Sequence, residues 1–425
     1  MSPSADSASM TTPGRLPGTS SYAQRGSLLR FMAPLDVIML FTWAFSIVLL
    51  FGWSQPLRYI AAAYFLGALV LFGRQTFPTA LRAWPTLIIP LLCIVSALWA
   101  PSAPDAIRKG MLFALGSVVS IYAASRVSGR NILLVFIGVE TIAAILSVLK
   151  PSIMGGAWTG VFGQKNFLAI NMFILYIAAL GVMLDKQTNR WFRLWALGVA
   201  PLAFFIMLMT KSATTTVMVI GATGAMLGHA FLWQPAAKVQ HLRLLIVMVA
   251  TVALLAAMLW LFGFLRIDAE NSVLSALGKD STLTGRTYLW ATAERTMSEH
   301  PLLGVGADGF WRSEYGLANS ITRYFDYEEY VKFSFHNSYL ENGVAFGYPG
   351  YWATIFIAAW AMWRPGITWL KNQTAINAAF LILAIMVIIR TTTEIDLALE
   401  FTATCTLLFA GAARVDKPLP GARRT

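Results

Sequence analysis

Charged residues are scarce in this sequence. Asp, Glu, Lys and Arg make up 12% of its 425 residues, whereas hydrophobic residues make up 57%. A soluble domain carries roughly a quarter of charged residues. The shortage excludes a chain of two or three soluble domains. Apolar runs of 17 to 25 residues recur between Ile38 and Ala413, and each is long enough to cross a hydrocarbon layer of about 30 Å.

Cysteine and histidine are also rare. The two cysteines, Cys93 and Cys405, fall inside apolar runs, so we expect them to pack as small hydrophobic residues and not to form a disulfide. The four histidines include no pair at the spacing of metal ligands. The sequence therefore predicts no metal site and no cofactor.

The formal net charge of +12 raises the question of nucleic-acid binding. No basic stripe lies on a soluble segment, so no nucleic-acid partner is expected. If the N-terminus is cytoplasmic, 18 Lys and Arg residues lie in cytoplasmic segments and seven in the short segments on the other side. This bias follows the positive-inside rule and predicts that both termini are cytoplasmic.

The hydropathy pattern predicts an all-α, polytopic membrane bundle of about twelve transmembrane helices. The expected spans are 33–53, 57–73, 84–100, 108–125, 131–149, 166–184, 192–209, 212–232, 243–263, 337–363, 373–390 and 395–413. The predicted organisation is a disordered cytoplasmic tail (1–32), helices 1–9 (33–263), a large helical loop outside the cytoplasm (264–336), helices 10–12 (337–413) and a cytoplasmic tail (414–425).

The long loop contains the strongest local signals for chemistry. Thr282 or Thr284 is placed to cap a helix that runs to about Glu299, and Arg286 falls in its first turn. A cation there lies near the positive end of the helix dipole, an arrangement that suits a bound anion such as phosphate. The alternative is an ion pair between Arg286 and a carboxylate of the loop.

His336 lies where the long loop re-enters the membrane. Its imidazole is a candidate general base for a hydroxyl that arrives from outside; the alternative is an interfacial histidine bonded to water. Lys165, Lys211 and Arg390 join Arg286 on the predicted outer side, where they would form a cationic pocket for a diphosphate. The alternative for the lysines is contact with lipid headgroups.

Two carboxylates lie within predicted spans. Glu140 is near the middle of 131–149, and Glu400 is deep in 395–413. A charged carboxylate at mid-bilayer costs about 2–3 kcal/mol, so each should face the interior of the bundle. The sequence gives no specific role for either.

Several of these segments together resemble the O-antigen ligase and polymerase superfamily. They are Trp158-Thr159-Gly160-Val161-Phe162 with Lys165-Asn166, Thr210-Lys211-Ser212, Thr284-Gly285-Arg286 with Trp290, Pro301-Leu302-Leu303-Gly304-Val305-Gly306, and His336-Asn337 followed by Gly343 and Gly347. The resemblance covers about residues 80–410 and is greatest to bacterial exopolysaccharide polymerases. Lys211 stands where ligases usually have arginine, which favours a polymerase-like member.

The resemblance implies a metal-independent, inverting glycosyltransferase in the bacterial inner membrane, with its active site facing the periplasm. Its donor would be a glycan on undecaprenyl pyrophosphate, with membrane lipid around it and a chain-length regulator and a flippase as further partners. His336 corresponds to the base and Arg286 to the catalytic loop arginine. Lys211, Lys165, Asn166, Asn337 and Arg390 would bind substrate.

Three functions are compatible with this pattern. The first is polymerisation of lipid-linked oligosaccharide repeats into exopolysaccharide or O-antigen. The second is a ligase that transfers finished glycan to lipid A core or to protein. The third, from another class, is a transporter or flippase for a lipid-linked sugar, although functional charge would then be expected along a central pathway.

Overall fold

The computed structural model describes residues 19–246, 248–249, 282–325 and 333–415. Its helices are α1 (Thr19–Val48), α2 (Gln55–Leu71), α3 (Gly73–Arg82), α4 (Ile88–Val95), α5 (Ala103–Arg126), α6 (Gly129–Leu149), α7 (Lys165–Leu184), α8 (Arg190–Met209), α9 (Ala213–Leu227), α10 (Gln234–Ala236), α13 (Thr282–Glu299), α14 (Gly316–Tyr324), α15 (Ser338–Lys371), α16 (Ala375–Arg390) and α17 (Ala403–Ala413). A two-stranded hairpin of β1 (Ile153–Met154) and β2 (Ala157–Trp158) connects α6 to the start of α7.

The helices are apolar enough to make this an all-α, multi-pass membrane protein. In the described part of the chain, five helical stretches are long and apolar enough to cross a membrane: α5, α6, α7, α8 and Thr214–Ala236. A sixth is possible if α2 and α3, which meet at a bend of 103°, form one span. The predicted fold class is thus confirmed, whereas the count of twelve stays a prediction, and the expected span 243–263 lies mostly outside the described residues.

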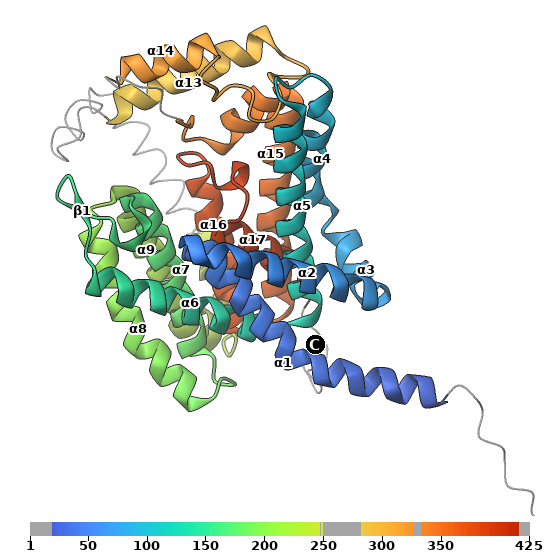
Figure 1. Cartoon of the computed structure of the whole chain (residues 1–425). Helices are drawn as coiled ribbons and strands as arrows, with labels where there is room; N and C mark the ends of the chain where they lie inside the picture. The colour runs from blue at the N-terminus through green and yellow to red at the C-terminus, as the bar shows by residue number, and fades with distance from the viewer. Residues whose placement is uncertain (1–18, 247, 250–281, 326–332, 416–425) are drawn as a thin grey trace, which may run out of the picture.

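Helix α7 is the centre of the bundle. It packs against α6, α8 and α16, and its side chains from Leu168 to Val182 are almost all buried. This run is apolar on every face, which is the pattern of a helix enclosed by other helices. Figure 1 shows α13 and α14 lying across one end of the bundle, above α5, α15 and α16. Helix α7 begins, and α16 ends, toward the same end.

The predicted loop helix is confirmed. Helix α13 runs from Thr282 to Glu299, and its apolar stripe of Leu289, Ala293 and Met297 is buried in a cluster with Leu340 and Val344 of α15. The stripe thus rests on the membrane bundle as the periodicity predicted.

The segment after α13 is fastened to α15 by its backbone. The Val305 and Gly306 N–H groups donate to the carbonyls of Val344 and Ala345 at 3.0 and 2.9 Å. Helix α15 breaks at Gly347, where φ is +70° and a Cβ atom would lie 2.5 Å from the Pro301 carbonyl oxygen. Only glycine combines this dihedral with so close an approach. The expected span 337–363 is therefore two helical pieces, joined where the loop docks.

The last predicted span, 395–413, is wrong at its start. Helix α17 begins at Ala403, and its N-cap is Thr402, whose hydroxyl accepts a hydrogen bond from the Cys405 N–H at 3.1 Å. The preceding segment, 391–402, contains a short 3-10 turn and is otherwise irregular. Glu400 therefore lies in this segment and not deep in a helix. The apolar content of 395–413 hid the break because hydropathy does not register capping hydrogen bonds.

Glu140 of α6 is enclosed in apolar side chains. It is fully buried, and neither carboxyl oxygen has a hydrogen-bond partner among the described residues. A buried polar group without a partner costs about 1–3 kcal/mol on protein scales. Glu140 thus faces the interior of the bundle, as expected, and lowers the stability of the folded protein.

We expect Glu140→Leu to stabilise the folded protein by about 1–3 kcal/mol, because it removes an unsatisfied group and keeps side-chain volume. The measurement is the midpoint of denaturant unfolding in detergent micelles. Val148→Leu, on the exposed face of the same helix, is the control and should change little. A lower midpoint for Glu140→Leu would show that this carboxyl has a stabilising partner.

Candidate functional site

A carboxylate that the sequence interpretation did not single out lies at the centre of a polar cluster. Glu394 Oε1 accepts a hydrogen bond from Asn166 Nδ2 at 2.9 Å and is 3.4 Å from Arg286 Nη2. Glu394 Oε2 is 3.4 Å from His336 Nδ1. The cluster therefore gathers residues from the start of α7, from α13 and from the segments before α15 and α17.

His336 is positioned by the residues on either side of it. The Phe335 N–H donates to Glu341 Oε2 and its carbonyl accepts from Trp290 Nε1, both at 2.9 Å. On the other side, the Asn337 side chain caps α15 by accepting from the N–H groups of Tyr339 and Leu340 at 3.0 and 3.2 Å.

Between these anchors, His336 has φ of +49°. This left-handed conformation is uncommon for a residue with a side chain, and it is typical of positions that the surroundings fix for a function. It turns the imidazole toward Glu394.

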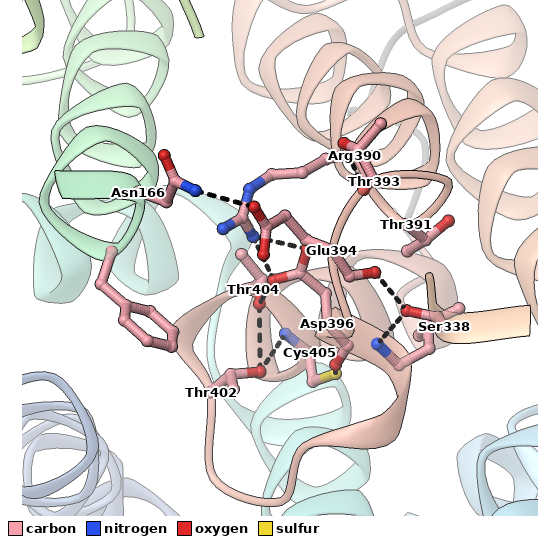
Figure 2. A network of polar contacts seen from close by, with 12 residues as sticks. Asn166, Ser338, Arg390, Thr391, Thr393, Glu394, Asp396, Thr402, Thr404 and Cys405 are labelled. Atoms are coloured by element: carbon pink, nitrogen blue, oxygen red, sulfur yellow. Dashed lines mark hydrogen bonds and ion pairs between the residues drawn. The ribbon is translucent and has the colours of Figure 1, made fainter. Parts of the chain in front are cut away.

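The segment that carries Glu394, residues 391–402, is held by the start of α15. The Ser338 hydroxyl donates to the Glu394 carbonyl at 2.9 Å, and the Ser338 N–H donates to the Thr391 carbonyl at 2.9 Å. Ser338 is fully buried, so the start of α15 and the end of α16 are bound together directly below the cluster. Figure 2 shows Asn166, Glu394 and Ser338 within this network.

A buried ion pair supports the same segment. Arg390, the last residue of α16, pairs with Asp396, and each is 5% exposed. Thr404 Oγ1 also donates to Asp396 at 3.1 Å, and Cys405 Sγ donates to the Asp396 carbonyl at 2.8 Å. Removing one member of such a pair leaves a charge without compensation. The pair and these two hydrogen bonds thus fasten segment 391–402 to the last residue of α16 and to the first turn of α17 (Figure 2).

The charge of Glu394 is set by competing effects. Burial by itself raises the pKa of the carboxyl, but the hydrogen bond with His336 and the charges of Arg390, His336 and Arg286 outweigh it. The pKa of Glu394 is consequently below its ordinary value. Glu394 is ionised at neutral pH and orients the imidazole beside it.

The cluster is open to a substrate on one side. The side chains of His336, Arg286 and Glu394 are 35%, 23% and 16% exposed. Because Nδ1 faces the carboxylate, His336 Nε2 is left without a hydrogen bond among the described residues. An imidazole whose Nδ1–H is held by a carboxylate has Nε2 available to take a proton. The arrangement can therefore perform general base chemistry beside an arginine.

The other predicted site residues lie around this cluster in different ways. Lys165 and Lys211 are exposed near the same end of the bundle, and neither makes a hydrogen bond or ion pair within the described ranges. Lys211 lies beside the β hairpin, since a Cβ atom on Gly156 would be 3.4 Å from its Nζ. Asn337 and Arg390 are both engaged in the protein's own structure, as the cap of α15 and the partner of Asp396.

Glu394 was missed because residues 391–394 were expected to be only a short connection between the spans 373–390 and 395–413. The sequence does carry a signal: Arg390, Glu394 and Asp396 lie within seven residues between two apolar runs. Three ionisable side chains at one end of a bundle are costly in lipid unless they pair. The sequence therefore allowed a prediction that these side chains form ion pairs with one another or with charged residues of the long loop.

The fold and the cluster define a multi-pass helical membrane protein with a histidine, a carboxylate and an arginine gathered at one end. Residues 198–355 match the O-antigen ligase family. Over 269 residues the chain is 25% identical to the exopolysaccharide production protein ExoQ of Rhizobium meliloti (strain 1021). Both similarities bear out the predicted resemblance to the O-antigen ligase and polymerase superfamily.

The matched regions include some of the site residues and leave out others. The alignment with ExoQ covers 61% of this chain, and the chain spans about 60% of the length of that relative. The family match includes Arg286 and His336, whereas Glu394, Asn166 and Arg390 lie outside residues 198–355.

Proposed function

We propose that this protein polymerises oligosaccharide repeats carried on undecaprenyl pyrophosphate, at the periplasmic face of the bacterial inner membrane. The observation that carries the proposal is the pairing of His336 with Glu394, next to Arg286, at one end of a lipid-embedded bundle. A base and a cation side by side are what transfer from a lipid diphosphate to a hydroxyl requires.

In the proposed reaction, His336 Nε2 takes the proton of an acceptor hydroxyl while the oxygen attacks the anomeric carbon of the donor. The bond between that carbon and the diphosphate oxygen breaks, and the electron pair leaves with the lipid diphosphate. Attack opposite the leaving group inverts the anomeric configuration. Glu394 stabilises the imidazolium that forms, and Arg286 stabilises the negative charge of the leaving group without a metal ion.

A cleft beside the cluster supports a lipid-linked donor. It has a volume of about 490 Å³, and Trp290 and Asn337 line it next to the site, while Ile355, Ala358 and Met362 of α15 line it further down the helix. An apolar wall that runs from the site along a membrane helix suits a polyprenyl chain better than it suits water. The diphosphate would then lie at the upper end, beside Arg286.

A ligase of the same fold is the second candidate. The family that matches residues 198–355 is described by ligase activity, and a ligase would use the same base and leaving-group cation. The two functions differ in the acceptor: a further repeat for a polymerase, and lipid A core or protein for a ligase.

The test is a reaction with purified protein in liposomes. Repeat units linked to undecaprenyl pyrophosphate are isolated from the host strain, and product length is determined on a gel. A ladder of lengths supports a polymerase. A single product that forms only after lipid A core is added supports the ligase, and unlengthened donor that changes leaflet would show a transporter and overturn both.

Arg286→Ala should lower the rate of polymer formation by about 10-fold to 100-fold, because the leaving group loses one preorganised cation. Lys165 and Lys211 remain near the same end and moderate the loss. Arg286→Lys should recover part of the rate, since it restores the charge without the bidentate fork. Arg295→Ala, an exposed arginine on the same helix, is the control. Equal rates for Arg286→Ala and this control would remove Arg286 from the reaction.

A further inference from the structure

A second cavity is lined by the chain segments that carry Asn166 and Glu394. Its volume is about 600 Å³, within the range of small-molecule sites, and its walls come from the end of α1, from α2, from the start of α7 and from residues 396–404. Gln164, Asp396 and Glu400 are among the residues that line it. Gln164 and Asp396 are each two residues from a member of the Glu394 cluster. The segments before α7 and before α17 thus contribute both to the cluster and to the lining of the cavity.

An arginine in this cavity has little of its hydrogen-bonding capacity used. Arg58 Nη2 donates to the Ser46 carbonyl at 2.7 Å, and the guanidinium lies over the Phe401 ring, 4.7 Å from its centroid. The Arg58 Nε atom is buried without a partner, and Arg58 makes no ion pair with any described residue. The guanidinium is thus fixed in place, with donors that the protein itself does not satisfy.

Glu400 lines the same cavity with its carboxylate, whose charge acts on Lys109 without forming an ion pair. It is half-buried, and within the described ranges it makes neither a hydrogen bond nor an ion pair. Arg58 and Glu400 therefore present an unused donor group and an unused acceptor group to one space. Phe162, Phe167 and Phe401 add aromatic surface.

The balance of charge indicates the class of ligand. Arg58 contributes one positive charge and Glu400 one negative charge, while Asp396 is neutralised by Arg390. A diphosphate needs an excess of positive charge, which this cavity does not have. Sugar hydroxyls both donate and accept hydrogen bonds, and the apolar faces of sugar rings pack on aromatic side chains.

We propose that this cavity is a saccharide site that holds the acceptor glycan, with Arg58 and Glu400 as its hydrogen-bonding residues. The proposal rests on the proposed function, because an acceptor beside the cluster would present its hydroxyl to His336. The apolar cleft along α15 then serves the donor lipid, and the two substrates approach the cluster from different sides.

The test measures saccharide binding apart from turnover. The probe is a mixture of oligosaccharides obtained by partial hydrolysis of the host strain's own extracellular polysaccharide and labelled at the reducing end. Fluorescence anisotropy gives its Kd for the full chain in lipid nanodiscs. Arg58→Ala and Glu400→Gln should each raise Kd about tenfold or more, the effect of losing a hydrogen bond to a charged group. Arg74→Ala and Glu314→Gln, two exposed positions outside the cavity, are the matched controls and should leave Kd unchanged.

Two further variants keep the result unambiguous. Val161→Trp fills the cavity from the α7 side and should also weaken binding, so the proposal does not depend on whether Arg58→Ala folds. His336→Ala should bind the oligosaccharides as the wild type does while it forms polymer about 10³-fold more slowly, which separates the saccharide site from the reaction. Equal Kd values for the cavity variants and the controls would overturn the saccharide site alone. Competition by inorganic pyrophosphate that requires Arg58 would likewise overturn it, because the cavity would then hold the leaving group.

Discussion

Replacement of His336 by alanine is expected to lower the rate of polymer formation in liposomes by about 10³-fold or more, near the upper part of the range for a general base. The physical reason is the geometry of the imidazole. Its Nδ1 is 3.4 Å from Glu394, and its backbone is fixed by the hydrogen bonds of Phe335 and Asn337. No other histidine in the described part of the chain lies at this cluster.

The matched control is His300→Ala. His300 is exposed just beyond the end of α13, and its loss should leave the rate within about twofold of the wild type, as expected of a surface position without special contacts. Both variants should insert and elute as the wild type does in detergent. A His336→Ala protein that forms a normal ladder would remove the base and leave Glu394 and Arg286 without the role proposed for them.

Helix positions were largely predictable because lipid imposes a simple rule on them. A spanning segment must be apolar over its length and must satisfy its own backbone. This is why the expected segments 131–149, 166–184 and 192–209 agree with α6, α7 and α8 to within two residues. Helix α13 was predictable as well, because a threonine at its start, Pro301 after its end and an apolar stripe between them all indicate the same helix.

The arrangement of the site was less predictable, since it depends on contacts between distant segments. His336 and Arg286 were predicted as site residues, but the carboxylate that contacts both comes from residue 394, after two further helices. Arg390 was expected to bind a diphosphate, whereas in the structure it pairs with Asp396. Both outcomes follow from one break between α16 and α17, where polar side chains satisfy each other within a run that hydropathy treats as a span.

Glu394→Gln is expected to lower the rate of polymer formation by about 10²-fold to 10³-fold. The amide keeps the size of the side chain and its contact with Asn166, but it removes the charge that orients His336 and stabilises the imidazolium. Neutralising the carboxylate of a histidine–carboxylate pair is known to disturb catalysis through the histidine tautomer. Glu394→Asp keeps the charge on a shorter side chain and should recover part of the rate. Glu299→Gln, on the exposed end of α13, is the control.

The pH dependence separates this positioning role from a general effect on the fold. The pKa of Glu394 in the folded protein is lowered, so its contribution to stability is fully present above the unfolded value of about 4.3. That contribution is lost as the pH falls through the lower pKa of the folded state. The difference in unfolding midpoint between wild type and Glu394→Gln should therefore be constant from about pH 5 to pH 8 and shrink below about pH 4.

The rate should behave differently across the same range. If Glu394 orients the imidazole, the Glu394→Gln protein stays slow at every pH above about 5, even where its folded fraction equals that of the wild type. If Glu394 is instead a structural residue, the rate recovers wherever the fold does, and added glycerol or a lower temperature restores both together. A slow enzyme that is fully folded supports the His336–Glu394 pair as the catalytic centre; recovery of rate with stability assigns Glu394 to the support of segment 391–402.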